Sequence, residues 1–237
     1  MNFWWHLAIE NIRKLKIETE FLETLCVNIT IRKETENEYR QVEKLVREAF
    51  WNLYVPGCDE HYLVHIMRTH ADYLPEMSFV AEVDGDIVGM IAYTRSHLMD
   101  EAGNQLKTLT FGPLCVHPKW QGKGVGPALV EHSRDLAIEL GESAIAILGH
   151  PRNYVKFGFK NGIDFNVSDQ EGNYPFGQLI LPLKEDVFSG NKWRLHVSGV
   201  YSFSPDDALA FDKSFPEKEK KVMPSQEEFS IAVRAKL

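Results

Sequence analysis

The glycine-rich run at 121–126, Gln-Gly-Lys-Gly-Val-Gly, holds the residues best suited to chemistry in this sequence. It follows an apolar stretch at 109–116 with the composition of a β-strand, and it precedes a helical pattern over 127–140. Glycine lets the backbone approach a ligand closely, and a helix N-terminus adds free amide groups and a partial positive charge. The order strand, glycine turn, helix therefore predicts a site for a phosphate group.

The spacing of the glycines excludes two common phosphate-binding motifs. The nucleoside triphosphate loop needs a Gly-Lys-Ser or Gly-Lys-Thr after four intervening residues, and the sequence has no such run. The dinucleotide fingerprint needs G-x-G-x-x-G, whereas Gly122, Gly124 and Gly126 form G-x-G-x-G.

The elements that must position this turn define an α/β protein. The helix over 127–140 joins two strands, 109–116 and 144–148, which predicts that these two strands are parallel. The other expected strands are 27–33, 77–83, 87–96, 159–167, 178–183 and 193–203, and the other expected helices are 36–51 and 60–73. We expect an amphipathic helix over 1–26, a helical turn at 153–157, and a solvated loop or helix start at 216–221.

Composition places the chain among soluble globular proteins. Its 237 residues are 44% hydrophobic and carry a net charge of −8, which argues against binding nucleic acid through broad phosphate neutralisation. The sequence has neither an apolar run long enough to cross a membrane nor a secretory leader, so we expect a cytoplasmic protein. The three cysteines have no metal-ligand spacing; we expect them reduced, with Cys115 a small core residue and no metal site.

Two motifs together indicate a family. Val116-His117-Pro118 leads into the run 121–126, and Tyr154-Val155-Lys156-Phe157-Gly158-Phe159 follows farther along the chain. Both resemble the acetyl-coenzyme A (acetyl-CoA) motifs of the GCN5-related N-acetyltransferase (GNAT) superfamily, over about 28–183. The stretch 148–151 is similar to a YhbS-type subgroup of predicted acetyltransferases.

This resemblance implies a fold and a division of the chain. The fold is a mixed, mostly antiparallel twisted sheet flanked by helices, with a central V-shaped cleft. The acetyltransferase domain would span 27–183, after an N-terminal helical appendage at 1–26. A C-terminal extension, 184–237, would pack on the domain. Gly112-Pro113 interrupts a strand and predicts a bulge that opens the cleft.

The resemblance also implies how acetyl-CoA is bound. The pantetheine arm would run along the backbone of Leu114, Cys115 and Val116. Because Pro127 has no N–H, the amide after Gly126 would come from Ala128. The pyrophosphate would thus be bound by backbone amides of Gln121, Gly122, Lys123, Gly124, Val125, Gly126 and Ala128. Many relatives have Asn seven residues before the motif tyrosine, where this chain has Ile147.

The implied reaction is transfer of an acetyl group to a primary amine by direct attack in a ternary complex. Tyr154 is the expected general acid for the departing thiolate, and a backbone N–H near Val116 would polarise the carbonyl. A base must take a proton from the amine, and four residues are candidates: Asp59, Glu60, Glu82 and His117. His150 could contact acceptor or cofactor, whereas we expect His61 and His65 on a solvated helix face.

Several alternatives stay open at this point. The chain could transfer a longer acyl group, act on a hydroxyl, or bind CoA without catalysis, and a homodimer is possible. The acceptor would be selected by 51–62, 95–107 and the C-terminal strands. Five aromatic residues could line its pocket or pack in the core: Trp51, Tyr54, Tyr62, Trp193 and Tyr201.

Overall fold

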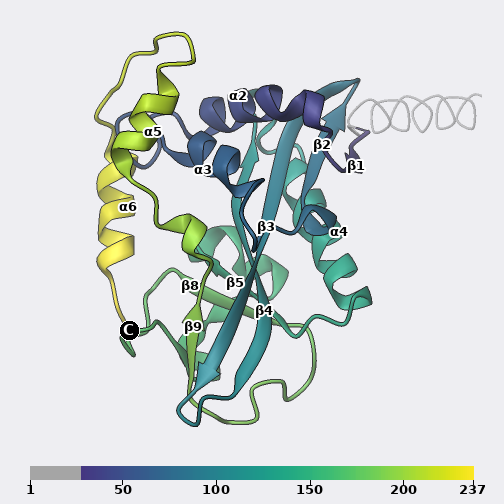
Figure 1. Ribbon diagram of the computed structural model, residues 1–237, viewed down its shortest axis with the longest axis vertical. Helices are drawn as coiled ribbons and strands as arrows, with labels where there is room; N and C mark the ends of the chain where they lie inside the picture. The colour runs from purple at the N-terminus through teal and green to yellow at the C-terminus, as the bar shows by residue number, and fades with distance from the viewer. Residues whose placement is uncertain (1–27) are drawn as a thin grey trace, which may run out of the picture.

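The computed structural model describes residues 28–237, which form one mixed sheet with helices on both faces (Figure 1). The helix expected over 1–26 lies outside the described residues. The first four strands form an antiparallel series: β1 (Thr30–Arg32), β2 (Phe79–Val83), β3 (Asp86–Asp100) and β4 (Gln105–Val116).

The second half of the sheet begins with the one crossover that the sequence predicts. Strand β5 (Ala144–Leu148) is parallel to β4, and α4 (Val125–Glu139) connects them, as expected. Strands β8 (Gln178–Pro182) and β6 (Lys160–Asn161) extend the sheet in antiparallel fashion. Strand β9 (Trp193–His196) pairs with the far half of β3 and with β7 (Val167–Ser168). The mixed, mostly antiparallel sheet of the sequence-based prediction is confirmed.

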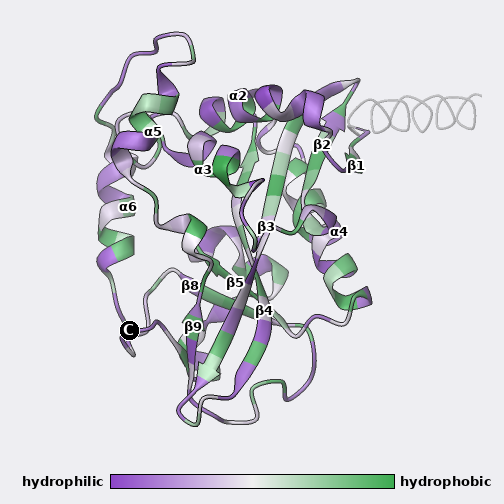
Figure 2. Cartoon of the chain, viewed as in Figure 1, coloured by the Kyte–Doolittle hydropathy of each residue, from purple (hydrophilic) through white to green (hydrophobic). Residues whose placement is uncertain are grey.

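Alternation along the strands sends apolar side chains to opposite faces, each covered by helices. Met90 contacts α2 (Tyr39–Phe50) and α3 (Glu60–Met67), whereas its neighbour Ile91 packs with α4. Many residues of these central strands are hydrophobic (Figure 2). Cys115 is buried under α2 and α3, as expected of a small core residue.

The sheet opens where β4 leaves β5. The two strands pair only at Leu109–Ile145 and Thr110–Ala146. Beyond this point β4 carries an extra residue opposite β3, because the register shifts at Gly112-Pro113, where the sequence predicts a bulge. The hydroxyl of Tyr201 donates to the Gly112 carbonyl at 3.3 Å and so contacts the bulge from the C-terminal segment. The edge of β4 from the bulge to Val116 therefore faces a cleft.

Three expected elements differ from the structure. The strand at 159–167 is wrong: the Asn161 side chain accepts a hydrogen bond from Ile163 N and starts a 3₁₀ turn between β6 and β7. The strand at 193–203 ends at His196, because Ser198 Oγ accepts from Val200 N and begins another turn. The helix expected over 60–73 ends at Met67.

The C-terminal region contains two helices that the sequence-based prediction missed, α5 (Pro205–Asp212) and α6 (Pro224–Arg234). The expected loop at 216–221 separates them. Short 3₁₀ helices are Glu36–Glu38, Pro75–Met77, Pro118–Trp120, Pro151–Asn153, Val155–Phe157, Gly162–Phe165 and Gly199–Tyr201.

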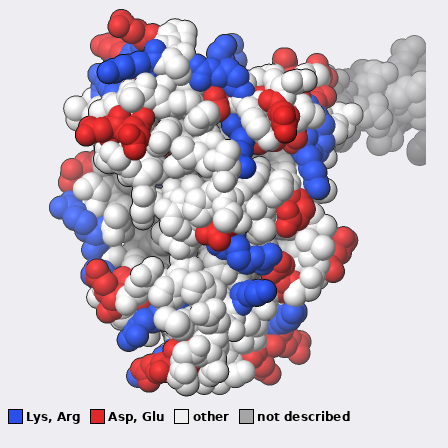
Figure 3. All heavy atoms as spheres, viewed as in Figure 1, with Lys and Arg blue, Asp and Glu red and all other residues white. Residues whose placement is uncertain are grey.

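The face shown in Figure 3 has interspersed acidic and basic side chains around a largely uncharged centre. Among residues 28–237, no helix combines the length and apolar composition that crossing a membrane requires.

Candidate active site

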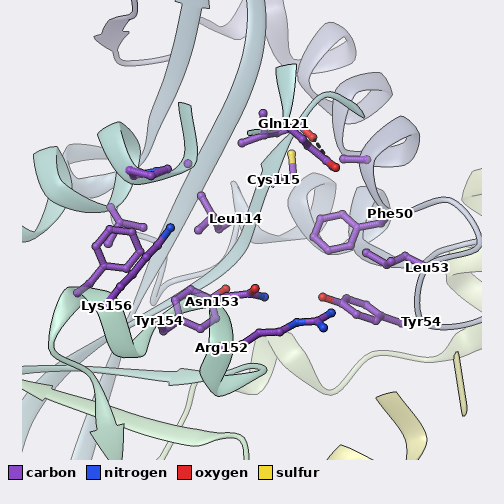
Figure 4. A pocket seen from close by; sticks show the side chains of 16 residues that line it. Phe50, Leu53, Tyr54, Leu114, Cys115, Gln121, Arg152, Asn153, Tyr154 and Lys156 are labelled. Atoms are coloured by element: carbon purple, nitrogen blue, oxygen red, sulfur yellow. Dashed lines mark hydrogen bonds between the residues drawn. The ribbon is translucent and has the colours of Figure 1, made fainter. Parts of the chain in front are cut away.

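A cavity of about 320 Å³ lies where β4 and β5 diverge. Its walls come from the end of β4, the first turn of α4, the end of α2 with the loop after it, and the segment 152–157 (Figure 4). Its lining residues are Ala49, Phe50, Leu53, Tyr54, Leu114, Cys115, Val116, Gln121, Gly126, Pro127, Val130, Arg152, Asn153, Tyr154, Lys156 and Phe157.

The β4 wall of the cavity is a strand edge without a partner strand. Leu114, Cys115 and Val116 pair with β3 on one side, and β5 has already diverged on the other. The Gln121 side chain donates from Nε2 to the Val116 carbonyl at 3.2 Å. This bond ties the glycine turn to the end of the strand.

The glycine turn leads directly into α4. Gly124 has φ +87°, a left-handed conformation that favours glycine, and it precedes the first residue of the helix. Ala128 N donates to Gly124 O at 3.0 Å, so the amide that the sequence assigned to a ligand is used inside the helix. The amides that a first helical turn leaves free lie before it.

The expected phosphate-binding residues divide into two groups. Gln121 and Gly126 line the cavity. Val125 is buried against the core, and the Lys123 ammonium lies 4.5 Å from the centre of the Trp120 ring. Gly122, Lys123, Gly124, Val125 and Ala128 are not among the lining residues.

Tyr154 lies in the cavity wall formed by the segment 152–157. Its ring packs against both Phe111 and Phe159, at centroid distances of 5.7 and 6.0 Å. A Cβ added at Gly149 would lie 2.7 Å from Tyr154 Cε2, so only glycine leaves room for the ring. Burial raises the pKa of Tyr154, which keeps the phenol protonated at neutral pH.

Two of the four candidate bases are engaged elsewhere. Glu82 accepts a hydrogen bond from Arg32 Nε at 2.8 Å on β1. His117 Nδ1 accepts from Lys119 N at 3.2 Å. Neither residue lines the cavity.

The other two candidates stand at the start of α3. Burial raises the pKa of Asp59 and raises that of Glu60 to about 7. Burial also raises the pKa values of the Tyr54 hydroxyl and the Cys115 thiol, and the charge of Glu60 adds to both shifts. Glu60 Oε2 accepts a hydrogen bond from Asp59 N at 3.2 Å, and neither Asp59 nor Glu60 is among the lining residues of the cavity.

The expectation of a solvated histidine face on α3 is wrong for His61. This side chain is fully buried, with Nε2 at 3.1 Å from Asp212 Oδ1 and Nδ1 at 3.4 Å from Cys58 Sγ. Burial lowers the pKa of His61 to about 4. His61 is buried because α5 covers this face of α3. His65 is exposed and pairs with Glu43. No cluster suited to metal binding occurs within residues 28–237.

Of the five aromatic residues considered for an acceptor pocket, Tyr54 alone is among the cavity's lining residues. Trp51 donates from Nε1 to the Glu219 carbonyl, and Tyr62 packs against Phe203. Trp193 and Tyr201 lie in the core and against the bulge. The hairpin at 95–107 contributes no lining residue.

Two basic residues of the cavity escaped the sequence-based prediction. Arg152 and Lys156 flank Tyr154 and both line the cavity. Their spacing around the motif tyrosine is the signal that could have identified them. His150 accepts from Arg152 N at 3.3 Å, and its ring packs edge-on against Phe176.

Comparison with known sequences adds family information to this geometry. Residues 46–159 match the model of the acetyltransferase (GNAT) family. The uncharacterised N-acetyltransferase YhbS of Escherichia coli K12 is 31% identical over 120 residues, which cover 50% of this chain and 66% of YhbS, just under two thirds. The uncharacterised N-acetyltransferase YjhQ of the same strain is 33% identical over 86 residues, which cover 36% of this chain and 47% of YjhQ.

Solved structures give the same fold. The crystal structure of E. coli YhbS in complex with CoA superposes with a TM-score of 0.64 at 23% identity, over 75% of this chain and 93% of YhbS. A GNAT family acetyltransferase from Brucella melitensis in complex with acetyl-CoA has a TM-score of 0.57 at 21% identity, over 73% of this chain and 98% of that protein.

Proposed function

We propose that this chain is a GNAT-type N-acetyltransferase that moves the acetyl group of acetyl-CoA to a primary amine, which its match to the family model and its similarity to YhbS support. One observation carries the proposal. A single cavity joins the unpaired edge of β4, the glycine turn at the start of α4, and the protonated phenol of Tyr154.

The residues of the cavity fit CoA in its two main parts. The unpaired backbone of Leu114, Cys115 and Val116 offers strand-like hydrogen bonds to the amides of a pantetheine arm. Gln121 and Gly126 place the first turn of α4 at one end, where free amides and the helix dipole favour a pyrophosphate. The Lys156 ammonium adds a positive charge to the wall of the cavity.

The reaction needs one proton acceptor and one proton donor. We assign the acceptor to Glu60, whose carboxyl pKa of about 7 suits a base at neutral pH. The amine loses a proton to Glu60, its nitrogen forms a bond to the acetyl carbonyl carbon, and the bond from that carbon to sulfur breaks. The departing thiolate then takes the phenolic proton of Tyr154.

Substitution of Tyr154 by Phe tests this assignment. The variant removes one hydroxyl and keeps the ring against Phe111 and Phe159. We expect kcat for acetyl transfer to fall about 100-fold while the calorimetric Kd for CoA stays within about twofold. A Tyr154→Phe enzyme with wild-type turnover would show that Tyr154 is not the acid.

A further inference from the structure

Helix α6 packs against a residue of the cavity wall, and hydrogen bonds hold the chain near both of its ends. Near its start, Gln226 Nε2 donates to the Asn52 carbonyl at 3.1 Å, and the Phe229 ring stacks on Tyr54 with centroids 4.2 Å apart. After its end, Phe176 N donates to the Ala235 carbonyl at 2.9 Å. The helix has no buried residue, so these terminal contacts hold it in place.

The contacts near the two ends of α6 involve different neighbours. Tyr54 lines one wall, and Phe176 contacts His150, which leads into Arg152 on the other wall. Figure 1 shows α6 along one edge of the molecule. Helix α6 therefore contacts the cavity wall at Tyr54, on the side toward which the Arg152 side chain extends (Figure 4).

Arg152 provides an unused positive charge on the same side. Its side chain extends toward the Tyr54 hydroxyl, away from Lys156 (Figure 4). The Arg152 side chain is exposed, unlike the buried Arg47 and Arg68, which have carboxylate partners at 2.7 to 3.0 Å. Within residues 28–237 the Arg152 guanidinium has no carboxylate partner. An arginine fork in a cavity is suited to bidentate binding of a carboxylate.

We propose that the acceptor is an amine that also carries a carboxylate, as an amino acid does, and that Arg152 binds this carboxylate beside Tyr54. This inference rests on the proposed acetyl transfer and adds the substrate class. The Tyr54–Phe229 stack borders the carboxylate site, and Glu60, the base of the proposed reaction, receives the amine proton. The two charged ends of the acceptor thus meet groups of opposite charge.

Matched acceptors test the carboxylate. Free amino acids and their amides present the same α-amine, but the amides lack the negative charge. We expect kcat/KM for the acids to exceed that for the amides at least about tenfold. Arg152→Gln should abolish this preference through KM, with a loss of about 10- to 100-fold for the acids and little change for the amides. Arg134→Gln, which removes an exposed arginine paired with Asp135 on α4, is the charge-matched control and should retain the preference.

Three results would overturn the inference. The wild-type enzyme could use amides as well as acids, or acetylate an internal lysine of a ten-residue peptide as well as a free amino acid. Arg152→Gln could weaken CoA binding in calorimetry and leave the acid preference intact, which would assign Arg152 to a cofactor phosphate. Turnover of amides alone would leave the proposed acetyl transfer standing, whereas CoA binding without turnover of any amine would overturn both.

Discussion

Replacement of Gly149 by Ala should slow catalysis without any change in the catalytic groups. The added Cβ would lie 2.7 Å from Tyr154 Cε2 and 3.5 Å from Cδ2 and Cζ. Ordinary contacts of this kind begin near 3.4 Å, so the ring must retreat by about 0.7 Å. Phe111 and Phe159 pack against the ring, so its movement displaces the hydroxyl from the departing thiolate.

The size of the effect follows from that displacement. A misplacement of about 1 Å can cost about 100-fold in rate, so we expect kcat to fall between 10- and 100-fold. The crowding should also lower the free energy of unfolding by about 1–3 kcal/mol. The Kd for CoA should change little, because Gly149 is not a lining residue of the cavity.

Pre-steady-state measurement of acetyl transfer, with calorimetry of CoA binding, separates these effects. Gly199→Ala is the matched control, since a Cβ there meets no atom within 4 Å. In a Tyr154→Phe background, Gly149→Ala should have little further effect on kcat, because both changes act on the same hydroxyl. Full additivity of the two substitutions, or a wild-type kcat for Gly149→Ala alone, would refute the positioning role.

Two other predictions concern pH. With saturating substrates, kcat should rise up to about pH 7 as the Glu60 carboxyl loses its proton, and Glu60→Gln should flatten this rise; an unchanged profile would assign the base elsewhere. The pKa of His61 is lowered from 6.5 to about 4, so between these values the unfolded chain binds a proton that the folded chain does not. The free energy of unfolding should therefore fall by up to about 3 kcal/mol as pH drops from 6.5 to 4, and urea titrations of His61→Gln should lack this fall.

The sequence was sufficient for the parts of the site that depend on local signals. The glycine turn before α4, the bulge at Gly112-Pro113 and the parallel pair of β4 and β5 each follow from residue types close together in the chain. Asn161-Gly162 was also a local turn signal, and the strand expected over 159–167 overlooked it. Likewise, Ser204-Pro205 followed by acidic residues marks the start of α5.

Other features depend on residues far apart in the chain, which periodicity does not reveal. The polar pattern of α3 predicts a solvated His61, but Phe211 and Phe215 cover it from about 150 residues away. The enclosure of Tyr54 by Phe229 has the same origin. Such contacts follow from tertiary packing, so the acceptor end of the cavity could not be derived from motifs.

The ion pair between Arg47 and Asp212 also bears on the order in which the molecule is assembled. Its partners are 165 residues apart, and the Arg40 guanidinium bonds Ser214 across 174 residues. During synthesis α2 and α3 leave the ribosome long before α5 and α6. The outer faces of α2 and α3 therefore stay uncovered until the C-terminal helices have been made. Contacts of such separation close late and slow folding. The nascent chain is thus expected to build its sheet first and to acquire a complete acceptor site only in the final step.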